Sequence, residues 1–221
     1  MPHMSKDLRP HPEVTGWLLA GGEGRRMNGQ DKGLIDYQGR PLGAWALEGL
    51  RGQCGTLRIS ANRNLDRYQT LLAEALGKQG AMGETPCKTI FPDDPDLPPA
   101  SGPLAGIVTA LRHTETDWLL IAPCDTPHLP HDLVDRLMSC AQQTNADIVM
   151  PCTQTGTSEV RHHWVCGLIR KRVCPDTVNQ FVNGERKVGR WVRTQRWASL
   201  SFGDATAFDN INTLETLRGR N

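Results

Sequence analysis

Apolar and polar stretches alternate along the chain in a way that predicts strands and helices in turn. Short apolar runs over residues 14–20, 56–61, 88–91, 118–122 and 146–150 are typical of buried strands. Between these runs, apolar residues recur at helical spacing over 42–53, 65–76, 103–113 and around Leu133, Leu137 and Cys140. This alternation indicates an α/β fold with a mostly parallel central sheet and helices on both faces.

The pattern changes after Pro151. We expect a polar loop over 153–161, a strand over 162–169, mostly helix over 170–182, a short helix through Val188 to Val192, and a strand over 198–202. Residues 208–213 form a return segment, after which Thr213 would cap a final helix. The chain contains no linker that would separate a second domain. We therefore expect a flexible tail over 1–13 and a single domain over 14–221.

Composition narrows the classes of function. The chain has 221 residues, 38% of them hydrophobic, and a formal net charge of +1. Bulk charge therefore gives no case for binding to nucleic acid or to a membrane, and no apolar run is long enough to cross a bilayer. The seven cysteines are scattered and never form C-x-x-C, so we expect reduced thiols in a cytoplasmic protein.

The first apolar run ends in a glycine-rich, cationic loop. Gly21, Gly22 and Gly24 can bring the backbone close to a ligand, and the nearby cations suit phosphate; they are Arg25, Arg26 and Lys32. The loop is neither a Walker A motif nor a dinucleotide fingerprint. A plain structural turn would not need this cluster of cations, so we interpret the loop as a triphosphate-binding segment.

Three further strand ends carry polar side chains that should meet the loop at one edge of the sheet. Asp125 is placed to hold Mg²⁺, although it could instead cap a turn. Lys32 is suited to neutralising phosphate oxygens, the alternative being a solvated surface lysine. Ser60, Asn62 and Asp93 are candidates for contacts with a base or a ribose, or are turn formers only.

Two other polar groups have simpler interpretations. Cys124 has no histidine or other base beside it in sequence, so we expect a small buried residue and not a nucleophile. His162 and His163 are adjacent and would face opposite ways on a strand, and we expect at least one of them to be structural.

Five segments, in order, resemble the molybdenum cofactor guanylyltransferases, the MobA family. The first reads Leu-Ala-Gly-Gly-x-Gly-x-Arg-Met-x-Gly-x-Asp-Lys-Gly-Leu from Leu19 to Leu34. The others are Gly-Pro-Leu-Ala-Gly at 102–106, Pro-Cys-Asp-Thr-Pro at 123–127, Gly-Glu-Arg-Lys-Val at 184–188 and Asn-Ile-Asn-Thr at 210–213. The likeness extends from about Val14 to the C-terminus.

The resemblance implies the Rossmann-like nucleotidyltransferase fold and transfer of GMP from MgGTP to Mo-molybdopterin, with release of pyrophosphate. Residues 14–150 would then form the GTP-binding half and 151–221 the pterin-side half. The implied GTP contacts are Leu19, Ala20, Gly21, Lys32, Asp93 and Asp125, to which we add Gly22, Ser60 and Asn62 as candidates. Our catalytic candidates are Lys32, Asp125 and Arg26, although Arg26 could instead form a structural ion pair. The resemblance implies Mg²⁺ on Asp125 and molybdopterin contacts from Gly184, Arg186, Lys187, Asn210 and Asn212.

The sequence departs from the family pattern at two positions. Asn28 stands where glycine is usual, and Ser60 stands where the family often has asparagine. The Leu-Ala-Gly-Gly form resembles the GTP-using branch. Alternatives are a cytidylyltransferase acting on the same pterin, a sugar-phosphate nucleotidyltransferase, and a non-catalytic carrier of molybdopterin. Partners implied by the resemblance are GTP, Mo-molybdopterin, molybdenum-insertion proteins and molybdoenzyme clients.

Overall fold

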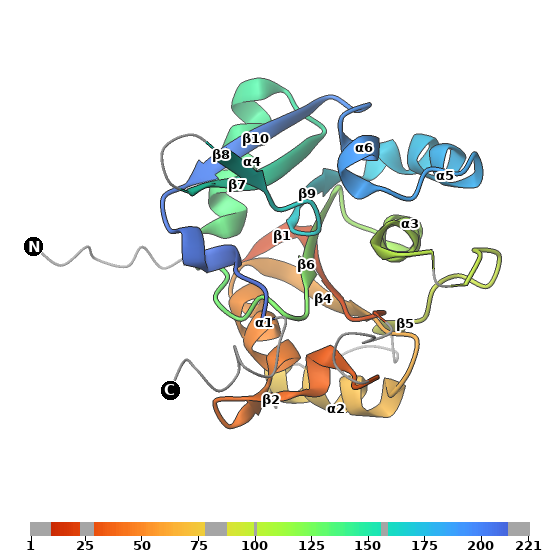
Figure 1. Cartoon of the computed structure of the whole chain (residues 1–221), viewed down its shortest axis with the longest axis vertical. Coiled ribbons are helices and arrows are strands. Elements are labelled where there is room, and N and C mark those ends of the chain that lie inside the picture. Colours follow the sequence, from red (N-terminus) through yellow and green to blue (C-terminus); the bar gives the residue numbers. More distant parts are fainter. Residues whose placement is uncertain (1–9, 23–28, 78–87, 100, 156–158, 212–221) are drawn as a thin grey trace, which may run out of the picture.

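The computed structural model describes residues 10–22, 29–77, 88–99, 101–155 and 159–211. In this part of the chain, one eight-stranded sheet runs in the order β10-β7-β9-β6-β1-β4-β5, with β8 paired to β7 (Figure 1). The strands are β1 (His11–Leu19), β4 (Cys54–Ser60), β5 (Ile90–Phe91), β6 (Trp118–Pro123), β7 (Ile148–Thr155), β8 (Glu159–His162), β9 (Gly167–Arg170) and β10 (Trp197–Phe202). The short strands β2 (Asp36–Tyr37) and β3 (Arg40–Pro41) pair separately.

Most pairings in the large sheet are parallel, as the sequence predicts. Strand β1 pairs in parallel with β4 and β6, β4 with β5, and β7 with β10. Strand β9 is antiparallel to both of its neighbours, β6 and β7. The carboxyl ends of β1, β4, β5 and β6 consequently lie at one edge of the sheet.

Helices cover both faces of the sheet. Helices α1 (Leu42–Arg51), α2 (Leu65–Leu76) and α4 (Leu133–Thr144) pack on one face, and α3 (Pro103–His113), α5 (Cys174–Val182) and α6 (Val188–Val192) on the other. Side chains of β6 alternate between the two cores: Leu120 and Ala122 join the first, Leu119 and Ile121 the second. Burying each such leucine or isoleucine contributes about 1.5–3 kcal/mol.

The first strand starts earlier than predicted. It begins at His11, so the expected boundary of the tail at residue 13 falls inside the strand. The backbone N–H of His11 donates to the Gln53 carbonyl at 3.0 Å, and its ring Nε2 lies 2.6 Å from Asp135 Oδ1. These contacts hold a polar stretch in the sheet that an apolar pattern does not reveal.

The region from 153 to 169 differs most from the sequence prediction. Strand β7 continues to Thr155 and pairs with β8, where a polar loop was expected over 153–161. The strand expected over 162–169 is divided, because β8 ends at His162 and β9 begins at Gly167. Three of the four residues of β8 are exposed, so this strand lacks the apolar run on which the prediction depended.

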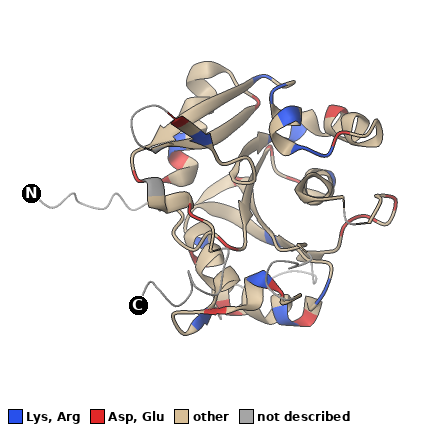
Figure 2. Cartoon of the chain, in the orientation of Figure 1, with Lys and Arg blue, Asp and Glu red and all other residues tan. Residues whose placement is uncertain are grey.

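Charged side chains of both signs are spread over the molecule (Figure 2), in keeping with the net charge of +1. In the described ranges, none of the helices is long and apolar enough to cross a membrane.

Candidate active site

The register of the sheet brings the predicted site segments side by side. Leu19, the last residue of β1, is paired with Ser60 on one side and with Pro123 on the other, and Ser60 is in turn paired with Phe91. The residues that follow these positions are Ala20–Gly22, Asn62, Asp93 and Asp125. The four polar strand ends therefore meet at one edge, as predicted.

Lys32 and Asp125 form an ion pair at this edge. Lys32 Nζ donates to Asp125 Oδ2, although the two residues are 93 positions apart in the chain. The Asp125 side chain is 11% exposed and that of Lys32 is 23% exposed. The pair thus joins the segment after the glycine loop to the end of β6, with one cationic and one anionic group both within reach of a ligand at the surface.

Asp31 fixes the backbone that carries Lys32. It precedes the 3₁₀ helix η2 (Lys32–Leu34) and is itself buried. Its carboxylate accepts from Tyr68 Oη at 2.5 Å and from Asn64 Nδ2 at 2.9 Å. Burial beside this carboxylate raises the pKa of Tyr68, so the phenol stays protonated and donates.

The hydrophobic pattern of the sequence does not reveal this support. It placed Tyr68 only on the buried face of a helix, and the periodicity that revealed that face carries no information about a partner for the hydroxyl group.

Gly33 is required for close packing behind the ion pair. A Cβ at this position would lie 2.5 Å from Tyr68 Oη and 3.2 Å from the Cβ of Cys124. Any other residue would push apart η2, α2 and the end of β6. Gly33 therefore allows Lys32 and Asp125 to lie close enough to pair.

Arg63 ties together the two ends of the glycine loop. Its guanidinium donates to the carbonyls of Gly22 at 3.3 Å, Gly29 at 2.8 Å and Gln30 at 3.0 Å. The predicted residues between these anchors, Arg25, Arg26 and Asn28, lie outside the described residues. Gly21 and Gly22 are exposed, as a loop that contacts a ligand requires.

Asn62 and Asp93 are joined by two hydrogen bonds. Asn62 Nδ2 donates to Asp93 Oδ2 at 2.9 Å, and the backbone N–H of Asp93 donates to Asn62 Oδ1 at 2.8 Å. Burial raises the pKa of the Asp93 carboxyl, the bond from Asn62 opposes that rise, and the charge of Asp94 adds to it.

Ser60 lies deeper than Asn62 and Asp93. It is 2% exposed, and its Oγ accepts from the indole Nε1 of Trp17 at 2.5 Å. Accepting this bond does not use the hydroxyl hydrogen of Ser60, which can still be donated to a ligand.

Asp94 anchors the loop that carries Asp93. Its carboxylate lies 2.9 Å from Arg112 Nη1 and 2.9 Å from His113 Nε2, and its backbone N–H donates to Thr109 Oγ1 at 3.0 Å. All three partners belong to α3. This helix therefore holds the start of the 94–99 segment against the end of β5.

Cys124 and Asp125 differ in chemical role despite being adjacent. Burial raises the pKa of the Cys124 thiol, with further contributions from Asp125 and Asp31, which disfavours the nucleophilic thiolate. The prediction that Cys124 is a small buried residue is confirmed.

The donor set at Asp125 bears on metal binding. Within the described ranges, no three His, Cys, Asp or Glu side chains are grouped in a way that could hold a metal ion. A single strand-end carboxylate fits the mode in which Mg²⁺ is held by one or two carboxylates together with substrate phosphates and water.

The two predicted pterin-side segments lie in different places. Asn210 Oδ1 accepts from Thr126 Oγ1 at 3.0 Å, and the N–H of Ile211 donates to the Asp125 carbonyl at 2.9 Å, so this segment is beside Asp125. Asn212 lies outside the described residues.

The turn from Gly184 to Lys187 lies between α5 and α6, on the opposite face of the sheet from α1. Arg186 is directed back into the turn, where its guanidinium donates to the carbonyls of Phe181 at 2.5 Å and Glu185 at 2.7 Å and stacks 4.0 Å from the Phe181 ring centre. Lys187 is exposed at the start of α6. Gly184 also lines a shallow hollow of about 330 Å³, together with Gln180, Asn183, Glu185 and Arg190.

His163 has a structural environment. It is 9% exposed, its Nε2 lies 2.9 Å from Thr153 Oγ1, and its ring stacks on Phe208 with centroids 4.8 Å apart. Burial, with the nearby Arg161, lowers its pKa to about 4. His162 instead packs beside Trp164 and Trp197.

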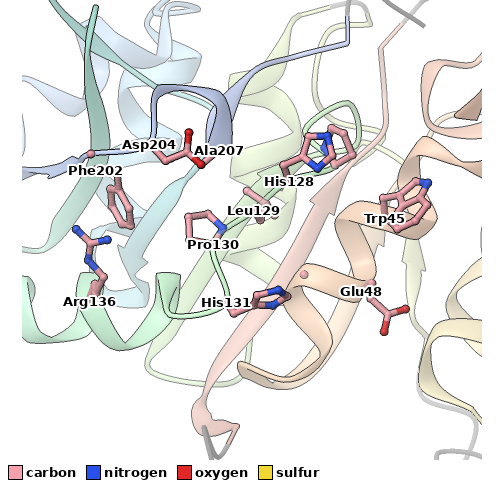
Figure 3. Close-up of a pocket in the computed structure, with 13 residues that line it drawn as sticks. Trp45, Glu48, His128, Leu129, Pro130, His131, Arg136, Phe202, Asp204 and Ala207 are labelled. Atoms are coloured by element: carbon pink, nitrogen blue, oxygen red, sulfur yellow. The ribbon is translucent and has the colours of Figure 1, made fainter. Parts of the chain in front are cut away.

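A larger hollow of about 440 Å³ lies beside the segment that follows Asp125 (Figure 3). His128, Leu129, Pro130 and His131 come from that segment, and Trp45 and Glu48 face them from α1. Arg136 stacks on Phe202 at the other end, 3.8 Å from the ring centre. Of the predicted site residues that the structure describes, none lines this hollow.

The fold and the polar strand edge define a nucleotidyltransferase, and comparison with known proteins agrees. Residues 16–199 match the model of the MobA-like NTP transferase domain. A protein of Bordetella petrii named molybdenum cofactor guanylyltransferase is 39% identical over 93% of this chain and 96% of its own length. One from Cupriavidus pinatubonensis with the same name is 37% identical over 93% and 95%.

The solved structures give the same fold. A crystal structure from Archaeoglobus fulgidus, described as molybdopterin-guanine dinucleotide biosynthesis protein A, has a TM-score of 0.68 at 18% identity and covers 93% of this chain and 95% of that one. The chain belongs to the family of MobA-like NTP transferases.

Proposed function

We propose that this chain transfers GMP from GTP to Mo-molybdopterin, which yields the guanine dinucleotide form of the cofactor and pyrophosphate. The observation that carries the proposal is the Lys32–Asp125 pair at the strand edge. It occurs in a chain that matches proteins named molybdenum cofactor guanylyltransferase over 93% of its length.

The reaction needs positioning and charge neutralisation more than acid–base chemistry. The terminal phosphate of the pterin is anionic at neutral pH, so it can attack the α-phosphorus of GTP without a general base. The new bond joins a pterin phosphate oxygen to the α-phosphorus, and the bond to the β-phosphate oxygen breaks. Pyrophosphate leaves with the electron pair of that bond.

Lys32 and Asp125 have complementary tasks in this proposal. Asp125 would hold Mg²⁺, which when bound neutralises charge on the phosphates. Lys32 would exchange part of its contact with Asp125 for phosphate oxygens and stabilise the departing pyrophosphate. The ion pair holds both side chains at the same edge of the sheet.

The polar side chains at the ends of β4 and β5 support guanine as the base. Guanine presents two kinds of N–H donor beside its O6 acceptor. The Asp93 carboxylate matches the donors, and the Ser60 hydroxyl, whose oxygen already accepts from Trp17, can donate to O6. Cytosine offers one exocyclic amino donor next to acceptors and is matched less well.

Calorimetry with GTP and CTP tests the choice of nucleotide directly. With Mg²⁺ present, we expect GTP to bind at least about tenfold more tightly than CTP, which corresponds to about 1.4 kcal/mol. Equal affinity, or a preference for CTP, would contradict the assignment of guanine.

A further inference from the structure

We infer that Asn62 is a positioning residue that orients the Asp93 carboxylate, and not itself a contact to the nucleotide base. This inference rests on the proposed function, because it concerns how the same site selects guanine. The evidence is the pair of hydrogen bonds between Asn62 and Asp93, the position of Gly21, and the direction in which Asp93 is left facing.

Both ends of the Asn62 amide are engaged by Asp93. The amide oxygen accepts from the Asp93 backbone N–H at 2.8 Å, and the amide nitrogen donates to the Asp93 carboxylate at 2.9 Å. The opposite amide orientation would place an oxygen against a carboxylate oxygen and a donor against a donor. The two bonds thus fix both the amide and the carboxylate in one arrangement.

Gly21 extends this arrangement to the glycine loop. Asn62 Nδ2 lies 3.5 Å from the Gly21 carbonyl oxygen, and a Cβ on Gly21 would approach Nδ2 to 3.1 Å. That approach is closer than about nine in ten real Cβ contacts. The glycine at this position therefore leaves room for Asn62 between the end of β1 and the end of β5.

Asp93 presents its second oxygen elsewhere. Its Oδ2 accepts from Asn62. The place that a Cβ on Gly106 would take lies 3.9 Å from Asp93 Oδ1 and 4.0 Å from Ser60 Oγ, so both oxygens border the same point. Gly106 is in α3, so the missing side chain leaves space beside both oxygens. Asn62 thereby directs Asp93 Oδ1 to the side that it shares with the Ser60 hydroxyl.

The test compares GTP with inosine triphosphate, which lacks the exocyclic 2-amino group. Calorimetry would use wild type, Asn62→Ala, Asp93→Ala and the double variant, with Asn179→Ala at an exposed position of α5 as a matched control. We expect wild type and control to prefer GTP about tenfold, as the loss of a hydrogen bond to a charged group predicts. In Asn62→Ala the preference should fall to about twofold or less, because GTP loses more affinity than inosine triphosphate does.

The double variant separates positioning from direct contact. If Asn62 acts through Asp93, adding Asn62→Ala to Asp93→Ala should cause no further loss of GTP affinity. In turnover, Asn62→Ala should raise KM for GTP and leave kcat nearly unchanged. An unfolding midpoint in urea close to that of wild type confirms that the variants are folded.

Two kinds of result would overturn the inference, and they are distinguishable. If wild type prefers GTP but Asn62→Ala keeps that preference, or if the two losses simply add, Asn62 does not act through Asp93. If wild type itself shows no preference for GTP over inosine triphosphate and CTP, the proposed function fails as well.

Discussion

At the scale of single residues, the site depends on a few polar side chains whose partners are distant in sequence. Lys32 pairs with Asp125 and Asp31 with Tyr68. The sequence indicated that Lys32 and Asp125 lie near phosphate, because both flank strand ends that meet at one edge. It could not show that they contact each other, because that contact depends on the register of β1 against β6.

Asp125 is the residue whose loss should be most damaging. In Asp125→Asn we expect pyrophosphate release to fall about 10³-fold, because several kcal/mol of charge stabilisation by Mg²⁺ is lost. The unfolding midpoint should change little, since the partly exposed Lys32 can turn to solvent. Asp132→Asn, at an exposed carboxylate ahead of α4, is the matched control. Activity of Asp125→Asn within threefold of wild type would contradict the role given to Asp125.

Tyr68 tests the support behind Lys32. In Tyr68→Phe the buried Asp31 loses one hydrogen bond, which should lower the free energy of unfolding by about 1–3 kcal/mol. Tyr37→Phe removes a hydroxyl that lies 3.2 Å from His128 Nε2, and should cost less, about 0.5–1.5 kcal/mol. Urea titration measures both. An equal or larger loss in Tyr37→Phe would argue against a buried anchor at Asp31.

At the scale of elements, the hydrophobic pattern was most informative where an element packs against the core of the sheet. The expected bounds of α2 and α3 are those of the structure, because their apolar residues recur at helical spacing between clear turn residues. The pattern failed for β8, a mostly exposed strand whose pairing with β7 depends on backbone hydrogen bonds. No sequence signal indicated that Arg186 would turn back onto Phe181.

Gly106 gives a prediction about α3. A Cβ there would make only ordinary contacts, 3.5 Å from Leu19 Cδ2 and 3.9 Å from Asp93 Oδ1. Gly106→Ala should therefore raise the free energy of unfolding by up to about 1 kcal/mol through helix propensity. If the base lies beside Asp93 Oδ1, the added methyl group should at the same time weaken GTP binding several-fold in calorimetry. Increased stability with unchanged GTP affinity would place the base elsewhere.

At the scale of the whole molecule, one continuous sheet joins the predicted GTP-binding and pterin-side halves, since β7, β9 and β10 continue the sheet from β6. Whether the halves divide the two substrates stays a prediction. His163 links β7 to η4 (Ala205–Phe208) within this second half, through Thr153 and Phe208.

Acid should destabilise the fold through His163. Its pKa of about 4 in the folded chain lies below the ordinary value of 6.5, so the unfolded chain binds the proton more readily. The contribution of neutral His163 to the free energy of unfolding is complete above pH 6.5. It is lost as the pH falls from 6.5 toward 4, by about 3 kcal/mol in total. Urea unfolding across this range should show that loss in wild type and in the exposed control His131→Gln. It should be much reduced in His163→Gln, and an unchanged pH dependence there would contradict the assignment.

The central claim is tested most directly by measuring pyrophosphate release from GTP. With Mg²⁺ and Mo-molybdopterin, we predict one pyrophosphate and one guanine dinucleotide cofactor formed per GTP consumed, and no release when the pterin is omitted. Release that is independent of the pterin, or that occurs with CTP and not with GTP, would contradict the account.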